Sequence, residues 1–138
     1  MTSIPIRSRP ASRDDLRAEA AAIGITEAYI SILVDSFYDR IRADEILGPI
    51  FERRIGDDWD PHLARMKAFW GSVALYTGQY SGKPVPVHYA ITEIEAGHFD
   101  HWLVLFEKTL EETAPSPGVV PYFMERARRI AESLKLAI

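Results

Sequence analysis

The segment WDPHLARMKAFW, residues 59–70, predicts an α-helix whose apolar face begins with a histidine. The inward-facing residues recur at i, i+4, i+7, i+8 and i+11, which is the spacing of one helical face. They are His62, Met66, Phe69, Trp70 and Val73. An imidazole at the head of such a stripe is a ligand, a gate to a cavity or an ordinary core histidine, so the rest of the chain has to decide its role.

Two further long segments have the same helical period. Residues 26–42 begin with a candidate N-cap, Thr26. Residues 95–113 form a second helix with an apolar face. The first stripe comprises Ile30, Leu33, Val34, Phe37, Tyr38 and Ile41. The second comprises His98, His101, Trp102, Leu105, Phe106 and Thr109. A last amphipathic helix is predicted to open at Pro121.

The shorter segments are predicted from capping and breaking residues. Residues 12–24 are expected to form either a short helix capped by Ser12 or part of a disordered arm. Gly48-Pro49 is predicted to break the chain into a turn, with Phe51 just beyond it. Since no region alternates apolar and polar residues over strand length, the predicted fold class is all-α.

Composition limits what the chain can do. Its 138 residues predict one domain, residues 25–138, preceded by an arm, residues 1–24. A net charge of −4 argues against nucleic acid, and the lack of cysteine excludes disulfides and thiolate metal sites. No stretch approaches the roughly 18 apolar residues of a membrane span, and the N-terminus lacks the apolar core of a signal peptide. We therefore expect a cytoplasmic monomer.

Four polar residues are predicted to converge on one cavity. Tyr38, His62 and Trp102 lie on core-facing stripes, and His88 lies in an irregular segment after PVPV. Each has a plain structural explanation by itself, because buried tyrosine and tryptophan often reach a backbone carbonyl. Taken together, they suit a haem pocket in which His88 binds iron while Tyr38 and Trp102 donate hydrogen bonds to a diatomic ligand.

The chain resembles the truncated haemoglobins of group III. The resemblance rests on FYDRIRADEILGPIF, WDPHLARMKAFWGSVALYTGQYSGKPVPVH and HFDHWLVLFEKTL, which occur in this order. It implies a globin-like 2-on-2 helical sandwich around haem b. The segment after His88, YAITEIEAG, departs from the family pattern because it lacks a Leu-Pro pair.

The resemblance also implies roles for individual residues. His88 matches the proximal histidine that binds the iron, whereas Tyr38, His62 and Trp102 match distal positions that stabilise the bound ligand. Further cofactor-binding positions match an aromatic wedge, two pocket-lining residues and a partner for a haem propionate. These are Phe51, Phe37 with Met66, and Arg65, respectively.

The predicted function is binding of dioxygen, nitric oxide and carbon monoxide at a polar distal pocket. Hydrogen bonds from Tyr38 and Trp102 would slow the release of dioxygen, which suits chemistry on the bound gas better than transport. Nitric oxide dioxygenation and peroxidase-like chemistry are the two candidate reactions, supported by an unidentified reductase.

Two other classes of function stay open from the residues alone. A non-haem metal protein could use His98 and His101, which are spaced i, i+3, together with Glu95 one turn away. A helical interaction module without a ligand would instead use the aromatic residues as core.

Overall fold

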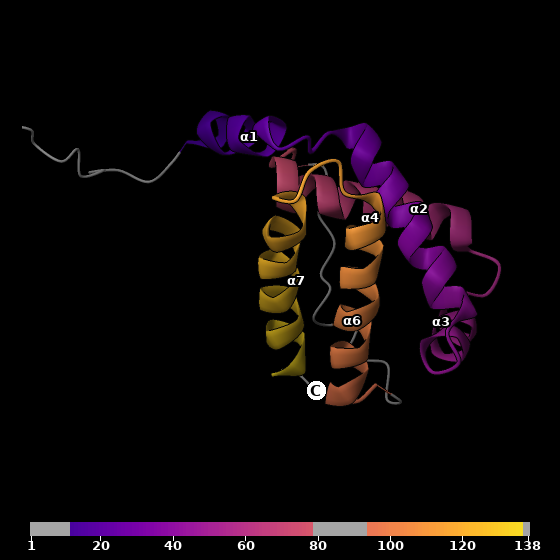
Figure 1. Ribbon diagram of the computed structural model, residues 1–138. Helices are drawn as coiled ribbons and strands as arrows, with labels where there is room; N and C mark the ends of the chain where they lie inside the picture. The colour runs from indigo at the N-terminus through magenta and orange to yellow at the C-terminus, as the bar shows by residue number, and fades with distance from the viewer. Residues whose placement is uncertain (1–11, 79–93, 137–138) are drawn as a thin grey trace, which may run out of the picture.

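Six helices account for most of the described chain in a computed structural model that describes residues 12–78 and 94–136 (Figure 1). They are α1 (Arg13–Ala22), α2 (Glu27–Ala43), α3 (Leu47–Ile55), α4 (Trp59–Leu75), α6 (Ala96–Thr113) and α7 (Val119–Lys135). The described residues contain no strand, which confirms the all-α prediction. Taken singly, none of these helices is long and apolar enough to cross a membrane, and α1 and α2 reach that standard only as a pair bent by 68°.

Two pairs of long helices form the framework. The helices α6 and α7 lie side by side, joined by a short connection, and α2 packs across α6 while also contacting α4 (Figure 1). Phe106 on α6 lies where the pairs meet, with its ring stacked on Trp70 of α4 at 5.0 Å and 5.0 Å from the ring of Phe37 on α2. The predicted 2-on-2 arrangement is therefore built around an aromatic core.

The helix α2 follows its sequence pattern closely. The Thr26 hydroxyl accepts a hydrogen bond from the Tyr29 N–H at 3.0 Å, which caps the first turn as predicted. Every residue of the predicted stripe is buried. The consequence is that α2 presents its apolar face to α3, α4 and α6 at once.

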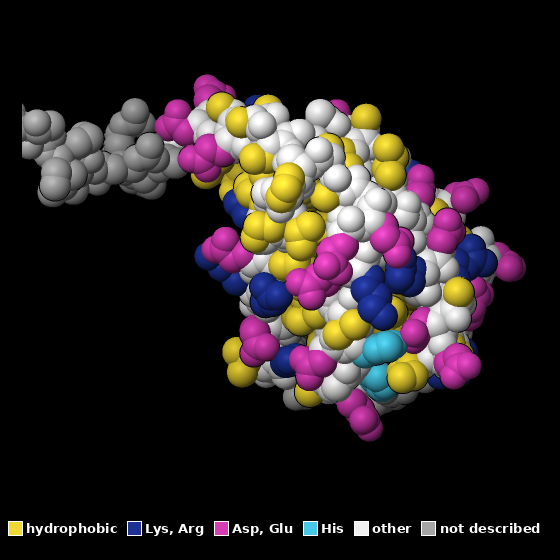
Figure 2. Space-filling model, in the orientation of Figure 1, with side chains coloured by type: hydrophobic (Ala, Val, Ile, Leu, Met, Phe, Trp, Pro, Cys, Tyr) yellow, Lys and Arg dark blue, Asp and Glu magenta, His cyan; other side chains and the backbone are white. Residues whose placement is uncertain are grey.

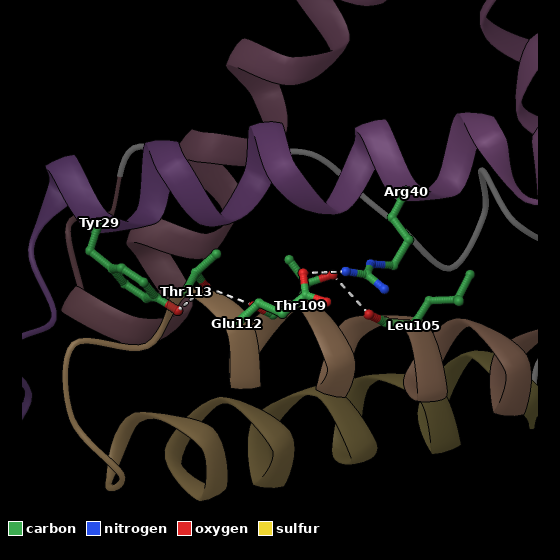
Figure 3. A network of polar contacts seen from close by, with 6 residues as sticks. All are labelled: Tyr29, Arg40, Leu105, Thr109, Glu112 and Thr113. Carbon is green, nitrogen blue, oxygen red and sulfur yellow. Dashed lines mark hydrogen bonds and ion pairs between the residues drawn. The ribbon is translucent and has the colours of Figure 1, made fainter.

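Polar contacts tie the first half of α2 to α6 (Figure 3). The Tyr29 and Thr113 hydroxyls are hydrogen-bonded at 3.0 Å, and the Thr113 hydroxyl donates to the Thr109 carbonyl at 2.8 Å. The Thr109 hydroxyl in turn donates to the Leu105 carbonyl at 2.8 Å. Arg40, further along α2, pairs with Glu112. The hydroxyl groups of this interface therefore all have partners within the protein.

The predicted break at Gly48-Pro49 is wrong, because both residues lie in the first turn of α3. Proline is tolerated there because the first N–H groups of a helix have no intrahelical acceptor. Asp44 supplies acceptors instead: its carboxylate binds the Ile46 and Leu47 N–H groups at 3.0 and 2.8 Å. Gly48 allows close packing, since a Cβ there would lie 2.8 Å from the Arg42 carbonyl oxygen.

The end of α4 is held by the two neighbouring helices. Arg17 of α1 donates to the Leu75 and Tyr76 carbonyls at 2.9 and 2.7 Å, and the Tyr122 hydroxyl donates to the Ala74 carbonyl at 2.8 Å. These groups satisfy carbonyls that a helix end leaves free. Of the two alternatives for residues 12–24, a short helix or a disordered arm, the structure shows the helix. It is capped by Ser12 as predicted and packs on α4. The boundary at residue 24 stays a prediction.

Candidate functional site

Tyr38 lies at the centre of a cluster of rings from three helices. Its side chain is 5% exposed, and its ring centroid lies 5.1 Å from that of His62 and 6.0 Å from those of Phe51 and Trp59. The hydroxyl forms no hydrogen bond with any residue in 12–78 or 94–136. Burial raises the pKa of Tyr38 above its ordinary value, so the phenol keeps its proton and remains a donor.

His62 faces this tyrosine from α4, at the head of the predicted stripe. The two rings are nearly perpendicular, at 88°, and Nε2 of His62 is buried without a hydrogen-bond partner in the described part of the chain. Burial, followed by the nearby Arg65 charge, lowers the pKa of His62 to about 4. The imidazole is therefore neutral at physiological pH, with one ring nitrogen able to donate and the other to accept.

Trp59 belongs to the same ring cluster, although the sequence interpretation did not include it. Its side chain is 7% exposed, its ring lies 5.7 Å from that of His62, and its Nε1 is also buried with no described partner. The Arg42 guanidinium covers the ring at 4.4 Å, and Arg42 itself pairs with Glu52 at 3.1 Å. The spacing could have revealed it, because Trp59 precedes His62 by i, i+3 on the same helix.

Trp102 reaches the cluster through Phe37. The Phe37 ring lies 5.2 Å from those of both Tyr38 and Trp102, while Trp102 stacks on Phe106 at 5.1 Å. The indole is partly buried and has no hydrogen-bond partner among the described residues. The structure therefore places Trp102 behind Phe37 and not in ring contact with Tyr38.

The remaining predicted residues occupy different settings. Phe51 packs beside Tyr38, and Met66 is partly buried against the core on the same helix as His62. Arg65 is exposed and pairs with Asp58 at 3.6 Å, so its predicted contact with a haem propionate stays a prediction. His88 lies outside the described residues.

The histidines of the alternative metal site have other partners. Nδ1 of His98 accepts a hydrogen bond from the Glu95 N–H at 2.9 Å, and Nε2 of His101 lies 2.9 Å from the Asp44 carboxylate. Figure 2 shows histidine side chains together at the surface near the lower end of α6, next to acidic groups. Residues 12–78 and 94–136 contain no group of three or more side chains placed to hold a metal ion.

An open hollow of ≈ 330 Å³ lies between α2 and α4, away from the ring cluster. Its lining includes Ile30, Ser31, Ala64 and Lys67, and none of the predicted site residues. The hollow is therefore separate from the ring contacts of Tyr38 and His62.

The unpartnered polar atoms concentrate at one place. Three buried side-chain nitrogens in the described chain lack hydrogen bonds, and two of them belong to the adjacent rings of Trp59 and His62. The third is Nε of Arg40, whose guanidinium pairs with Glu112. Leaving a buried polar group without a partner costs about 1–3 kcal/mol. A small ligand with an acceptor atom would satisfy the groups around Tyr38.

Comparisons with known proteins identify the family and agree with the fold. The sequence profile of the family described as "Bacterial-like globin" matches residues 21–134. A group 3 truncated hemoglobin, ctb, from Campylobacter jejuni is 36% identical over 89 residues, which cover 62% of this chain and 70% of that protein. The crystal structure of a group III truncated hemoglobin from the same organism superposes with a TM-score of 0.76 at 31% identity, covering 81% of this chain and 90% of that one.

Proposed function

Because the chain belongs to the bacterial-like globin family and is similar to group III truncated haemoglobins, we propose that it binds diatomic gases at a haem with a polar distal side. Membership of the globins implies haem and a diatomic ligand. The proposal adds the identity of the distal groups, namely Tyr38, His62 and Trp102, and of the iron ligand, His88.

The described residues fit the distal side of a haem. Phe37, Phe51 and Met66 supply apolar walls, and the Tyr38 hydroxyl and His62 Nε2 supply polar groups that have no partner in the described part of the protein. Haem, when bound, supplies an iron atom at which a gas molecule binds. His88 would hold that iron, and Arg65 would pair with a propionate.

The observation that carries the proposal is the perpendicular pair formed by Tyr38 and neutral His62. Tyr38 keeps its proton because burial raises its pKa, and its ring lies against those of Trp59 and His62. A hydrogen bond to a negatively polarised gas is worth about 1.5–3 kcal/mol, which is about tenfold or more in release rate. Slow release of dioxygen favours nitric oxide dioxygenation or peroxidase-like chemistry, with electrons from an unidentified reductase, over transport.

The visible spectrum of the purified protein supplied with haem tests the proposal. We expect a Soret band in the parent and its loss in His88→Ala. His98→Ala is the matched control, since it removes an imidazole that caps α6, and it should retain haem. Absence of the Soret band in the parent would overturn the proposed function.

The role of His62 can be separated from that of His88 by His62→Leu. This variant should keep its haem and change the rate of gas entry, because the imidazole faces Tyr38 and would face the gas without binding iron. Loss of haem in His62→Leu would show that the two histidine roles are reversed. The monomeric state and the cytoplasmic location stay predictions from the sequence.

A further inference from the structure

Trp59 has the burial and the unpartnered N–H group that a distal hydrogen-bond donor requires. Its indole is more than nine-tenths buried, and Nε1 has no partner among residues 12–78 and 94–136. The ring meets Tyr38 at 6.0 Å with an interplanar angle of 62°, and His62 at 5.7 Å and 88°. An indole N–H can only donate, so a buried one requires an acceptor.

The orientation of this indole is fixed from outside by a charged pair. The Arg42 guanidinium lies 4.4 Å from the centre of the ring, and Glu52 of α3 holds Arg42 at 3.1 Å. A cation over an aromatic face is attracted by the ring electrons. Rotation of Trp59 would break this contact, so Arg42 restricts the directions in which Nε1 can point.

Resting on the proposed function, we propose that Trp59 is a further distal residue whose N–H donates to the acceptor atom of the bound gas. The ligand class is a small molecule whose outer atom carries negative charge, such as dioxygen, with a water molecule as the acceptor when gas is absent. Arg42 is a positioning residue for this donor. Trp59 thus adds a donor from α4 to the three distal residues that the family resemblance implied, which are Tyr38, His62 and Trp102.

This role predicts discrimination between gases. Dioxygen accepts a hydrogen bond strongly because it gains negative charge on binding, whereas carbon monoxide stays close to neutral and accepts weakly. Removing the Trp59 N–H should therefore weaken the binding of dioxygen more than that of carbon monoxide. A residue that only fills space would change both to a similar extent.

The test compares Trp59→Phe with Trp70→Phe in haem-loaded protein. Trp70 is a matched control because it lies on the same helix, is 3% exposed and stacks on Phe106. In Trp59→Phe we expect the dioxygen release rate to rise about tenfold or more, with a smaller change for carbon monoxide. The infrared C–O stretch of the carbon monoxide complex should rise in frequency, because a nearby positive dipole is lost, and Trp70→Phe should leave it unchanged.

A double-mutant cycle tests the positioning role of Arg42. Arg42→Met keeps an unbranched side chain with its apolar stem but removes the cation, so it should raise the dioxygen release rate by less than Trp59→Phe does. Once Trp59 is phenylalanine, Arg42→Met should add nothing, since no N–H is left to position. Additive effects of the two substitutions would overturn the assignment of Arg42.

The outcomes separate this inference from the proposed function. A parent protein without a Soret band overturns both, whereas a haem-loaded parent in which Trp59→Phe behaves like Trp70→Phe overturns only the role of Trp59. If Trp59→Phe does not fold, the same question can be tested in the parent protein by NMR of ¹⁵N-labelled tryptophan side chains. The Trp59 N–H signal, assigned by elimination from Trp70→Phe and Trp102→Phe, should move downfield from the carbon monoxide complex to the dioxygen complex. An unmoved signal overturns the inference.

Discussion

Two tyrosines on the same helix, Tyr29 and Tyr38, show how interface and site differ in this protein. Both are buried on the inward face of α2, and burial raises the pKa of each phenol. The Tyr29 hydroxyl is bonded to Thr113, which itself donates to a carbonyl of α6 (Figure 3). The Tyr38 hydroxyl, among Trp59 and His62, has no partner in the described residues.

The difference separates a tyrosine whose hydroxyl joins two helices from one that, under the proposed function, would donate to the bound gas. At Tyr29 each hydroxyl has a partner within the protein, because Tyr29 bonds to Thr113 and Thr113 donates to the Thr109 carbonyl. At Tyr38 the neighbouring rings of Trp59 and His62 offer the hydroxyl no acceptor within the described chain, so under the proposed function its partner is the bound gas. The following substitutions are designed to break or sharpen this contrast.

The largest effect is expected from Phe37→Ala, which affects the site and the core together. Phe37 is 1% exposed, and its ring contacts Tyr38, Trp102 and Phe106 at 5.2, 5.2 and 5.0 Å. Truncation of such a residue costs about 3–5 kcal/mol in the free energy of unfolding, measured by urea titration. Val104→Ala, on the half-exposed face of α6, should change it by less than about 0.5 kcal/mol. A small loss in Phe37→Ala would show that the ring cluster is not part of the folding core.

Replacing each tyrosine by phenylalanine tests the contrast directly. Tyr38→Phe should raise the dioxygen release rate of the haem-loaded protein about tenfold or more, equivalent to about 1.5 kcal/mol or above, and leave stability unchanged or higher. Tyr29→Phe should lower the free energy of unfolding by about 0.5–1.5 kcal/mol and leave gas release unchanged, because only the bond to Thr113 is lost. If both variants changed stability alone, Tyr38 would be a second interface tyrosine.

The pH dependence of stability tests the environment of His62. Its pKa is lowered from 6.5 to about 4, so the unfolded chain binds a proton in this range that the folded protein does not. The stability that comes from keeping His62 neutral in the folded protein is therefore fully present above pH 6.5. It is lost as the pH falls toward 4. Since the ring is only partly buried, water screens part of the effect, and we expect about 1–2 kcal/mol.

His62→Gln supplies the reference for that measurement. Unfolding free energies of the parent and this variant, measured between pH 7 and 4, should diverge in slope below pH 6.5, with the parent falling more steeply. Equal slopes would contradict the depressed pKa and place His62 in contact with water.

Periodicity made the long helices and the inward direction of Tyr38 and His62 predictable from the sequence. A repeat near 3.6 residues directly reports which face of a helix is buried, so the stripe of α2 was correct at every position. The family resemblance, confirmed by the globin match, supplied the 2-on-2 arrangement that periodicity alone does not contain.

The missed features depend on contacts between helices. Gly48-Pro49 reads locally as a break, and only the Asp44 carboxylate and the close approach of α2 make it the start of α3. Trp59 reads as the first residue of a helix, and only the structure shows that Arg42 and Tyr38 lie against it. No local pattern encodes these partners, because they lie on other elements.

The smallest effects should come from two aspartates that precede helices, and they extend the contrast between satisfied and unsatisfied polar groups. Burial alone would raise the pKa of Asp44, but hydrogen bonds from Leu47, His101 and Ile46 lower it below its ordinary value. Among the described residues, the Asp58 side chain forms no capping bond at the start of α4, and it makes an exposed pair with Arg65.

Asp44→Ala should therefore lower the free energy of unfolding by about 1 kcal/mol, since two N–H groups of α3 lose their acceptor. Asp58→Ala should lower it by less than about 0.5 kcal/mol, because an exposed ion pair contributes little. Urea titration of both variants beside the parent measures the difference. Equal losses would mean that the charge of each aspartate near its helix, and not the hydrogen bonds of Asp44, provides the stabilisation.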